Sequence, residues 1–421
     1  MTRARWRALA VALAALVVVV AASVASASIQ SKKAVTLTFW QTMNDQETVT
    51  LNGLVSKFEA SHPGISVNVV YVPFDQRDAK FTAAAQAGKA PDVMRAEIAD
   101  VANWAAQGFL ADITKKVSAA DKADYLPSAF SYDNFQGKIW GIPQVTDAPA
   151  LLYNKKMFKA AGIKQPPATM DQLSTDCNKF GAGKGIFIRG DSYFIQPWIW
   201  AYGGGLLDYG AKQIQVADKG SVAGLTAYTK LFHSKCAFPD KDFSNDYGNM
   251  QTAFKNGQVA MIVNGPWSTA DILSGPAFKS SSNLGVAPVP KGPAGQGSPV
   301  GGHSYVIGRN TQHLDEAYTF MQWMSQSPQQ AQFAIHNNLL PTRVSAYKIP
   351  AVRTNRLIVD FLKQMKVAKA RPVTPQGGQI YSDFGPNMQK ALNGSLSPAA
   401  ALQATAQAWA QKLFPGFKIV K

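Results

Sequence analysis

Strand and helix patterns alternate along the first part of this chain, and this alternation constrains the fold more than any other feature of the sequence. The segment VTLTFW (35–40) alternates polar and apolar residues as a half-buried strand does. Asn44, with Glu47 three residues later, fits the capping box that begins a helix. Apolar residues then follow at helical spacing, namely Leu51, Leu54, Val55 and Phe58. Because ISVNVVYVPF (65–74) resumes as a strand, the right-handed crossover rule predicts two parallel neighbouring strands.

The same alternation continues along the whole chain. Further strands are predicted at PDVMRAE (91–97), KIWGIPQ (138–144), ALLYN (150–154) and QVAMIVNGPW (258–267). Helical patterns include VANWAAQGFL (101–110), TMDQLSTDCNKF (169–180), AGLTAYTKLFHSKC (223–236), EAYTFMQWMSQS (316–327) and SPAAALQATAQAWAQKLF (397–414). The 421 residues exceed the size at which one hydrophobic core keeps growing, so we expect an α/β protein with two lobes.

A segment rich in glycine and proline, PVPKGPAGQGSPVGG (288–302), interrupts the regular pattern. It is too short to link two independent domains. We interpret it as a crossing between two lobes that the chain visits more than once.

The first 27 residues have the pattern of a secretory signal peptide. Arg3, Arg5 and Arg7 precede an uncharged apolar run from Ala8 to Ala22, and Ala25-Ser26-Ala27 supplies the small residues of a cleavage site. The apolar run is shorter than the roughly 20 residues that span a bilayer. We therefore expect the mature protein to be exported, to the periplasm or the cell envelope.

The chain is strongly basic, with a formal net charge of +16, or 16 − 3 = +13 without the three arginines of the signal. Lysine and arginine are scattered along the sequence instead of gathered in a basic stripe. This distribution indicates a solvated surface that faces an anionic envelope, and we expect no nucleic-acid partner.

The sequence has only two cysteines, Cys177 and Cys236. In an exported protein such a pair can form a disulfide, and two buried free thiols are the alternative. No cysteine stands near the predicted cleavage site, so we expect no lipid attachment there.

Familiar catalytic motifs are absent from the sequence. It has no P-loop, no HExxH and no CxxC, and we expect neither a metal ion nor a cofactor. Five isolated histidines are expected at surface or turn positions: His62, His233, His303, His313 and His336. A Ser-His-Asp arrangement stays open, although no nucleophile elbow points to one. What remains is a set of aromatic residues and carboxylates at strand ends, which suits carbohydrate, because sugar rings stack on aromatic faces and sugar hydroxyls need polar acceptors.

Trp267, in MIVNGPWS (261–268), illustrates two readings of such an aromatic residue. The tryptophan either caps a hydrophobic core, as most tryptophans do, or stands at the rim of a cleft where its face meets a ligand. The short stretch alone does not choose between the two.

Four longer stretches resemble the extracellular solute-binding proteins of sugar ABC importers, in particular the maltose and maltodextrin-binding branch. They are LTFWQTMNDQE, FEASHPGISVNVVYVPFDQRDAKFTAAAQAGKAPDVMRAE, GIPQVTDAPALLYNKKMFKAAGI and FKNGQVAMIVNGPW. APDV and LLYNK are typical of the broad family, whereas NGPW together with DSYFIQPW is closer to the maltodextrin type. The resemblance implies a type II periplasmic-binding-protein fold, in which a hinge joins two α/β lobes and the sugar lies in the cleft between them. We place the first lobe at 35–146 and 299–345 and the second at 147–298 and 346–421.

The resemblance also implies roles for individual residues. Trp267 matches a tryptophan that stacks on a glucosyl ring, and Tyr193 matches a tyrosine of the same lobe. Tyr381 stands where the family carries a further stacking aromatic residue, usually tryptophan. The remaining candidates are polar residues expected to contact the sugar: Asn44, Asp45, Glu97, Asp147 and Asp191. The absence of a lipid-attachment cysteine departs from Gram-positive members of the family.

The resemblance implies a monomeric receptor that is not an enzyme and that passes an oligosaccharide to membrane permease subunits. Trehalose, cyclodextrin and other oligosaccharides remain alternatives to maltodextrin. The basic charge keeps an anionic or phosphorylated solute, of the glycerol phosphate type, among the candidates. A secreted glycan-active enzyme is a further alternative, which would need an acid/base pair of carboxylates astride one bond.

Overall fold

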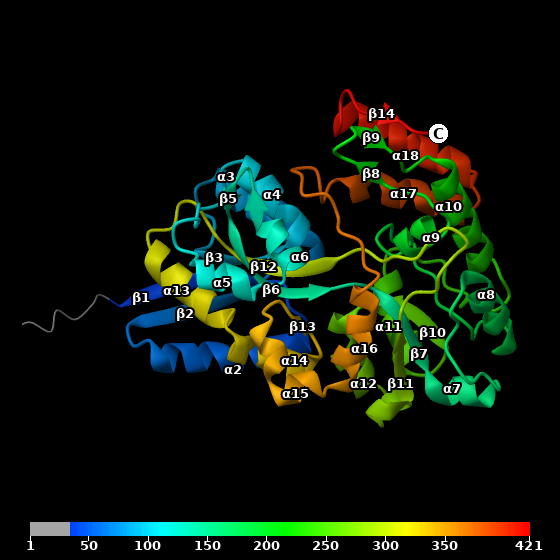
Figure 1. Ribbon diagram of the computed structural model, residues 1–421, viewed down its shortest axis with the longest axis horizontal. Coiled ribbons are helices and arrows are strands. Elements are labelled where there is room, and N and C mark those ends of the chain that lie inside the picture. The colour runs from blue at the N-terminus through cyan, green and yellow to red at the C-terminus, as the bar shows by residue number, and fades with distance from the viewer. Residues whose placement is uncertain (1–33) are drawn as a thin grey trace, which may run out of the picture.

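The computed structural model describes residues 34–421. The predicted signal peptide, residues 1–27, lies outside the described residues. Figure 1 shows two α/β lobes side by side. Within the described part of the chain, no helix is both long and apolar enough to span a bilayer.

The first lobe is built on a six-stranded mixed sheet with the order β13-β6-β12-β3-β1-β2. Its strands are β1 (Val35–Gln41), β2 (Ile65–Tyr71), β3 (Val93–Glu97), β6 (Gly141–Asp147), β12 (Gly301–Ile307) and β13 (Leu340–Pro341). β1 pairs with β2 and β3 in parallel, whereas β12 is antiparallel to β3 and β6. The predicted parallel unit at the start of the chain is therefore confirmed, and its register pairs Val35 with Ile65.

The helix between β1 and β2 begins as the capping box predicts. The Asn44 side chain accepts a hydrogen bond from the Glu47 N–H (2.9 Å) at the start of α2 (Asp45–Ser61). Glu47 does not complete the box, because its carboxylate turns toward the Arg95 guanidinium instead (3.8 Å). The predicted apolar residues of α2 are buried against the sheet.

Helices cover both faces of the six-stranded sheet. The core on one face contains residues of α2 and α13 (Leu314–Met324), and α14 (Ser327–Asn337) packs beside α2. The core on the other face contains residues of α3 (Arg77–Gln86) and α4 (Ile98–Ala106), with the Phe81 and Trp104 ring centroids 4.0 Å apart. The first lobe also contains α5 (Ala119–Asp124), α6 (Pro127–Phe130) and the hairpin of β4 (Asn134–Phe135) and β5 (Lys138–Ile139). The predicted strand at 138–144 is thus divided between β5 and β6.

The second lobe contains two smaller sheets. β7 (Ala150–Asn154) lies between β10 (Met261–Asn264) and β11 (Leu284–Ala287), and both pairings are antiparallel. β14 (Lys418–Ile419), β9 (Gln213–Ile214) and β8 (Leu207–Asp208) form the other sheet. Alternate residues of β7 enter different cores, since Leu151 faces one cluster and Leu152 the other.

The helices of the second lobe supply most of its two cores. One core includes residues of α8 (Met170–Lys179), α9 (Gln196–Ala201), α10 (Lys219–Phe232), α17 (Ile380–Leu392) and α18 (Pro398–Lys412). The other includes residues of α11 (Asp246–Lys255), α12 (Thr269–Ser274), α15 (Pro350–Arg353) and α16 (Arg356–Met365), together with Ala331 and Ala334 of α14. α7 (Lys155–Ala160) follows β7 directly.

The chain passes between the lobes repeatedly. β6 ends in the large sheet at Asp147, and β7 begins in the small sheet at Ala150. β11 ends at Ala287 in the second lobe, and β12 begins at Gly301 in the first. Figure 1 shows the yellow strand β12 lying among the blue and cyan elements of the first lobe. The segment rich in glycine and proline therefore makes one of the crossings.

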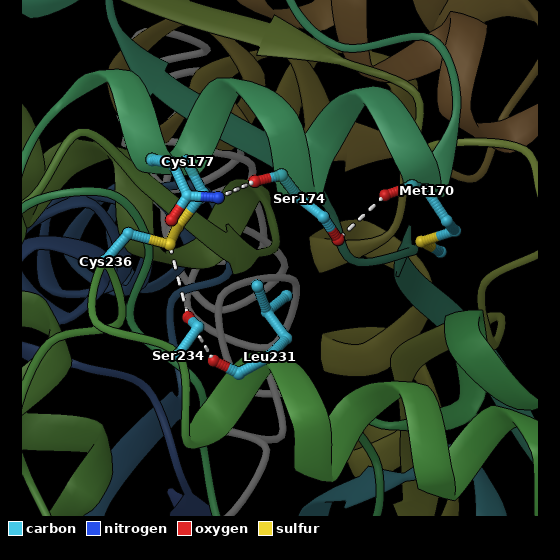
Figure 2. The surroundings of a disulfide bond; sticks show 7 residues. Met170, Ser174, Cys177, Leu231, Ser234 and Cys236 are labelled. Carbon is cyan, nitrogen blue, oxygen red and sulfur yellow. Dashed lines mark hydrogen bonds between the residues drawn. A yellow bond between two sulfur atoms is a disulfide. The ribbon is translucent and has the colours of Figure 1, made fainter.

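A disulfide joins Cys177 of α8 to Cys236, which lies just beyond the end of α10 (Figure 2). The helix predicted to run through Cys236 ends earlier, at Phe232. There the Thr229 and Leu231 oxygens accept hydrogen bonds from the N–H groups of His233 and Ser234, and the last of these closes a tighter turn. Both cysteines are buried, and the Ser234 hydroxyl lies 3.2 Å from the Cys236 sulfur.

Candidate functional site

The carboxyl ends of β1, β2 and β3 lie at one edge of the large sheet, where ligands bind in many open α/β folds. Polar residues stand at the ends of β1 and β3, because each of these two strands leads into a helix that a side chain caps. Asn44 caps α2, and Glu97 caps α4 by accepting a hydrogen bond from the Ala99 N–H (2.9 Å). Asn44 and Glu97, both predicted site residues, therefore also stabilise helix N-termini at this edge.

Arg371 is the centre of the group of candidate residues. It lies in the segment between α16 and α17, and its guanidinium donates to the Glu97 carboxylate at the end of β3. The same guanidinium lies 5.6 Å from the centroid of the Tyr193 ring. It also donates from Nε to the Val300 oxygen (2.8 Å), and its main-chain N–H donates to the Tyr132 hydroxyl (2.8 Å). Arg371 thus joins the two lobes at the candidate site.

Asp147 ends β6 and is buried next to this group. Its Oδ1 lies 2.2 Å from the point where a Cβ on Gly301 would stand, and the Tyr193 hydroxyl lies 2.7 Å from the same point. A side chain at residue 301 would therefore separate them. Burial raises the pKa of Asp147 to about 7, an effect that Arg371 opposes and Glu97 reinforces. Among residues 34–421 no hydrogen bond to this carboxylate is present, although Arg371 and Arg95 act on it electrostatically.

Tyr193 and Tyr381 stand together on the second-lobe side. Their ring centroids are 6.1 Å apart with an interplanar angle of 66°. Tyr381 lies in the first turn of α17, where the Gln196 amide donates to its hydroxyl (3.2 Å). The Tyr193 hydroxyl donates to the Pro299 oxygen (3.3 Å). The two rings are therefore fixed in orientation, as stacking partners for a ligand should be.

Trp267 lies at the junction of the lobes, in a single helical turn that follows β10 (Pro266–Ser268). It is half-buried and packs against the main core of the second lobe and also against a core of the first. Its indole N–H donates to the Tyr247 hydroxyl (3.1 Å), and its main-chain oxygen accepts from the Asn44 amide (3.1 Å). Trp267 is therefore neither a residue of a single core nor a free residue at the rim of a cleft, because it packs against one core of each lobe.

A cavity of about 370 Å³ opens on the second lobe beside these aromatic residues. It is lined by Asp191, Tyr247 and Tyr381, among others. Asp191 accepts a hydrogen bond from the Tyr193 N–H (2.8 Å) and pairs with Arg189 (3.3 Å), yet 40% of its side chain is exposed. Of the predicted residues, only Asp45 stands apart: it is exposed on the first turn of α2.

Three arginines near the site were not predicted from the sequence. Arg77 and Arg95 lie in the first lobe, and Arg371 lies in the segment before α17. Arg77 pairs with Asp100 (2.7 Å), Arg95 pairs with Glu47 (3.8 Å), and Arg371 pairs with Glu97. Tyr247, which meets Trp267, was also missed. No motif marks these residues, since each partner is distant in the sequence or lies in an irregular segment. In the described part of the chain, no group of three or more histidine, cysteine or carboxylate side chains is arranged to hold a metal ion.

Residues 44–331 match the family described as bacterial extracellular solute-binding proteins. The chain belongs to this family. This solute-binding protein is 25% identical over 370 residues to a maltodextrin-binding protein of Bacillus subtilis, covering 85% of this chain and 84% of the relative. A putative binding protein of Brucella abortus is 27% identical over 358 residues, covering 82% and 85% of the two chains.

Solved structures agree with this membership. The GacH receptor of Streptomyces glaucescens, solved unliganded and with acarbose, is 38% identical with a TM-score of 0.87, covering 91% of this solute-binding protein and 99% of the receptor. A maltose/maltodextrin-binding domain of Bdellovibrio bacteriovorus, bound to maltotriose, has a TM-score of 0.81 at 23% identity, covering 90% and 100%. At 23% identity, the similarity to the Bdellovibrio domain concerns the fold alone, and it supports the expected type II fold with two lobes.

Proposed function

We propose that the protein captures an oligosaccharide of the maltose and maltodextrin class between its lobes and delivers it to the permease subunits of an ABC importer. One observation carries this proposal: Glu97 and Asp147 from the first-lobe sheet and Tyr193 and Tyr381 from the second lobe converge on Arg371. Carboxylates accept paired hydrogen bonds from sugar hydroxyls, and tyrosine rings stack on the C–H faces of sugar rings.

A ligand that touches both groups favours the closed arrangement of the lobes. Such a ligand binds the closed form better than the open form, and this difference in affinity drives the hinge motion. The closed form is then the one that the permease accepts. We further propose that the protein acts as an exported monomer.

The charges at the site favour a neutral sugar over an anionic solute. Arg77, Arg95 and Arg371 each have a carboxylate partner, so none is left over to bind a phosphate. Asp147 adds a further carboxyl group. A phosphate ester would have to displace one of these ion pairs.

The same geometry favours binding over hydrolysis. Glycoside hydrolysis needs two carboxyl groups that are available to the scissile bond. One Glu97 oxygen is paired with Arg371, and the other accepts the Ala99 N–H; this holds the carboxylate in place as an acceptor for sugar hydroxyls and opposes its use as a nucleophile or base. We therefore propose a receptor that is not an enzyme.

Calorimetric titration of the mature protein tests the proposal. We expect maltotriose and maltotetraose to bind in the micromolar range or tighter, and glucose 1-phosphate and glycerol phosphate not to bind. Acarbose belongs in the series because the receptor that is 38% identical binds it. Trehalose and a cyclodextrin test the alternative sugars. A protein that binds none of the malto-oligosaccharides, or that cleaves maltotetraose at an enzymatic rate, would contradict the proposal.

A further inference from the structure

Phe74 is an exposed aromatic residue at the ligand-binding edge of the first lobe. It begins a single helical turn (Phe74–Gln76) just after β2, at the same sheet edge as Asn44 and Glu97. Its side chain is 48% exposed, although phenylalanine usually loses most of its surface on folding. No sequence motif drew attention to it.

The Phe74 ring is held in a fixed orientation. The Arg77 guanidinium covers one face at 4.0 Å from the ring centroid, and its Nη1 donates to the Phe74 main-chain oxygen (2.8 Å). Asp100 fixes the guanidinium in turn by accepting from its Nε (2.7 Å). With one face covered in this way, the exposed area belongs to the rest of the ring.

His303 supports the ring from the side of the sheet. Its imidazole meets the Phe74 ring edge-on, with centroids 5.9 Å apart and planes at 67°. His303 lies in β12 directly opposite Glu97, so the expectation that it is a surface or turn residue is wrong. Within the described residues neither ring nitrogen has a hydrogen-bond partner. Burial and three nearby arginines hold the pKa of His303 well below its usual range, so it packs as a neutral ring.

Short contacts connect this ring to the rest of the candidate site. Arg77, which covers Phe74, lies 3.9 Å from Glu97, and Glu97 pairs with Arg371 beside Tyr193. Phe74 therefore borders the group of residues to which the sugar is assigned, but from the first lobe.

We propose that Phe74 is a second stacking platform, on which a sugar ring of a longer oligosaccharide lies, with Arg77 and His303 as positioning residues. This inference rests on the proposed function. A ring whose orientation is already fixed loses little conformational entropy on binding, so its contact with the sugar contributes to affinity. The chemical class of ligand is a neutral oligosaccharide long enough to reach from Tyr193 and Tyr381 to the first lobe.

The test compares three substitutions by titration with maltose, maltotriose, maltotetraose and maltohexaose. Phe74→Ala removes the ring, Phe74→Leu keeps an apolar side chain without a flat face, and Phe74→Trp restores a flat face. We expect the first two to weaken maltohexaose binding about 5- to 10-fold and maltose binding by less, and Phe74→Trp to stay within about twofold of the wild type. Tyr209→Ala is the matched control, because Tyr209 is equally exposed, at 48%, but packs on Phe417 near β8.

The outcomes separate this inference from the proposed function. Wild-type binding with unchanged affinity in Phe74→Ala overturns the platform alone. Equal losses in Phe74→Trp and Phe74→Ala, or in Tyr209→Ala, also overturn it. A wild type that binds no malto-oligosaccharide overturns both. If Phe74→Ala fails to fold, the pair Phe74→Leu and Phe74→Trp decides, since both keep a large apolar side chain and the main-chain oxygen that accepts from Arg77.

Discussion

The side-chain amide of Asn44 donates a hydrogen bond to the main-chain oxygen of Trp267, 3.1 Å away, and so ties the N-terminus of α2 to the helical turn that follows β10. The two residues are 223 positions apart and belong to different lobes. The same Asn44 side chain caps α2 through its oxygen. One residue thus serves both a local helix end and the contact between lobes.

These two duties can be separated by substitution. Asn44→Asp keeps the cap, because aspartate caps helices as well as asparagine, but removes the donor to Trp267. We expect its unfolding free energy to change by less than about 0.5 kcal/mol and its maltotriose affinity to fall about 3- to 10-fold. Asn44→Ala should lose both, with about 1 kcal/mol of stability. Wild-type affinity in Asn44→Asp would show that the contact does not support closure.

Trp267 and Tyr193 should matter more for binding than for folding. Trp267→Ala removes an aromatic face from the junction, and we expect maltodextrin affinity to fall by about 2 to 4 kcal/mol, or roughly 30- to 1,000-fold. The melting temperature of the sugar-free protein should fall less than it would for an alanine substitution of a fully buried tryptophan, because Trp267 is only half-buried. Tyr193→Ala should behave likewise. If a folded Trp267→Ala protein binds maltodextrin with unchanged affinity, Trp267 is not part of the binding site.

Arg371 should be needed for stability as well as for binding. Arg371→Met removes the closest ion-pair partner of the buried Glu97 carboxylate and leaves only Arg77, 3.9 Å away, so we expect a cost of about 2 to 4 kcal/mol. Adding Glu97→Gln should recover part of this loss, as measured by urea unfolding of the two single variants and the double variant. Lys412→Met is the control, since the Lys412 and Asp383 pair is exposed and should be worth less than about 1 kcal/mol. Additive losses in the double variant would contradict the pairing.

Asp147 should make stability depend on pH. Burial raises its pKa from 3.8 to about 7 in the folded protein, so the folded state holds this proton more tightly than the unfolded state does. Its contribution is therefore most favourable in acid, is lost as the pH rises from about 4 to about 7, and is constant above that. Unfolding of the wild type and of Asp147→Asn across this range isolates the effect, because other buried carboxyl groups titrate in both. A pH-independent difference between the two proteins would contradict it.

The disulfide should contribute to stability and not to binding. It closes a loop with a sequence separation of 59, and its removal in Cys177→Ser with Cys236→Ser should cost about 2 to 4 kcal/mol. Maltotriose affinity should stay within about twofold, because both cysteines are buried between α8 and α10. Two free thiols titrated in the unfolded, unreduced wild type would end this prediction.

The sequence predicted the elements that depend on local patterns. β1, α2 and β2 follow from alternation, capping and helical spacing, all of which act within a few residues. The resemblance to sugar-binding proteins named Tyr193 and Tyr381, which the structure brings together, and Glu97 and Asp147, which lie near Arg371.

The sequence did not predict what depends on distant neighbours. Arg371 lies in an irregular segment, and its partner Glu97 is 274 positions away. Tyr247 meets Trp267 only because α11 packs beside β10. His303 was placed at the surface because an isolated histidine carries no signal, whereas β12 inserts it between β3 and β6. These contacts depend on the tertiary fold and not on any short stretch of sequence.

The position of β12 in the large sheet also bears on how the chain can be made and divided. β12 lies between β3 and β6, so the edge of each of those strands that β12 covers stays unpaired until the chain has been synthesised through Ile307. Until then β3 presents an open edge, which is a template for pairing with other chains. A fragment that stops before residue 307 should therefore aggregate, and no single continuous fragment can supply the complete first lobe without carrying the strands β7, β10 and β11 of the second.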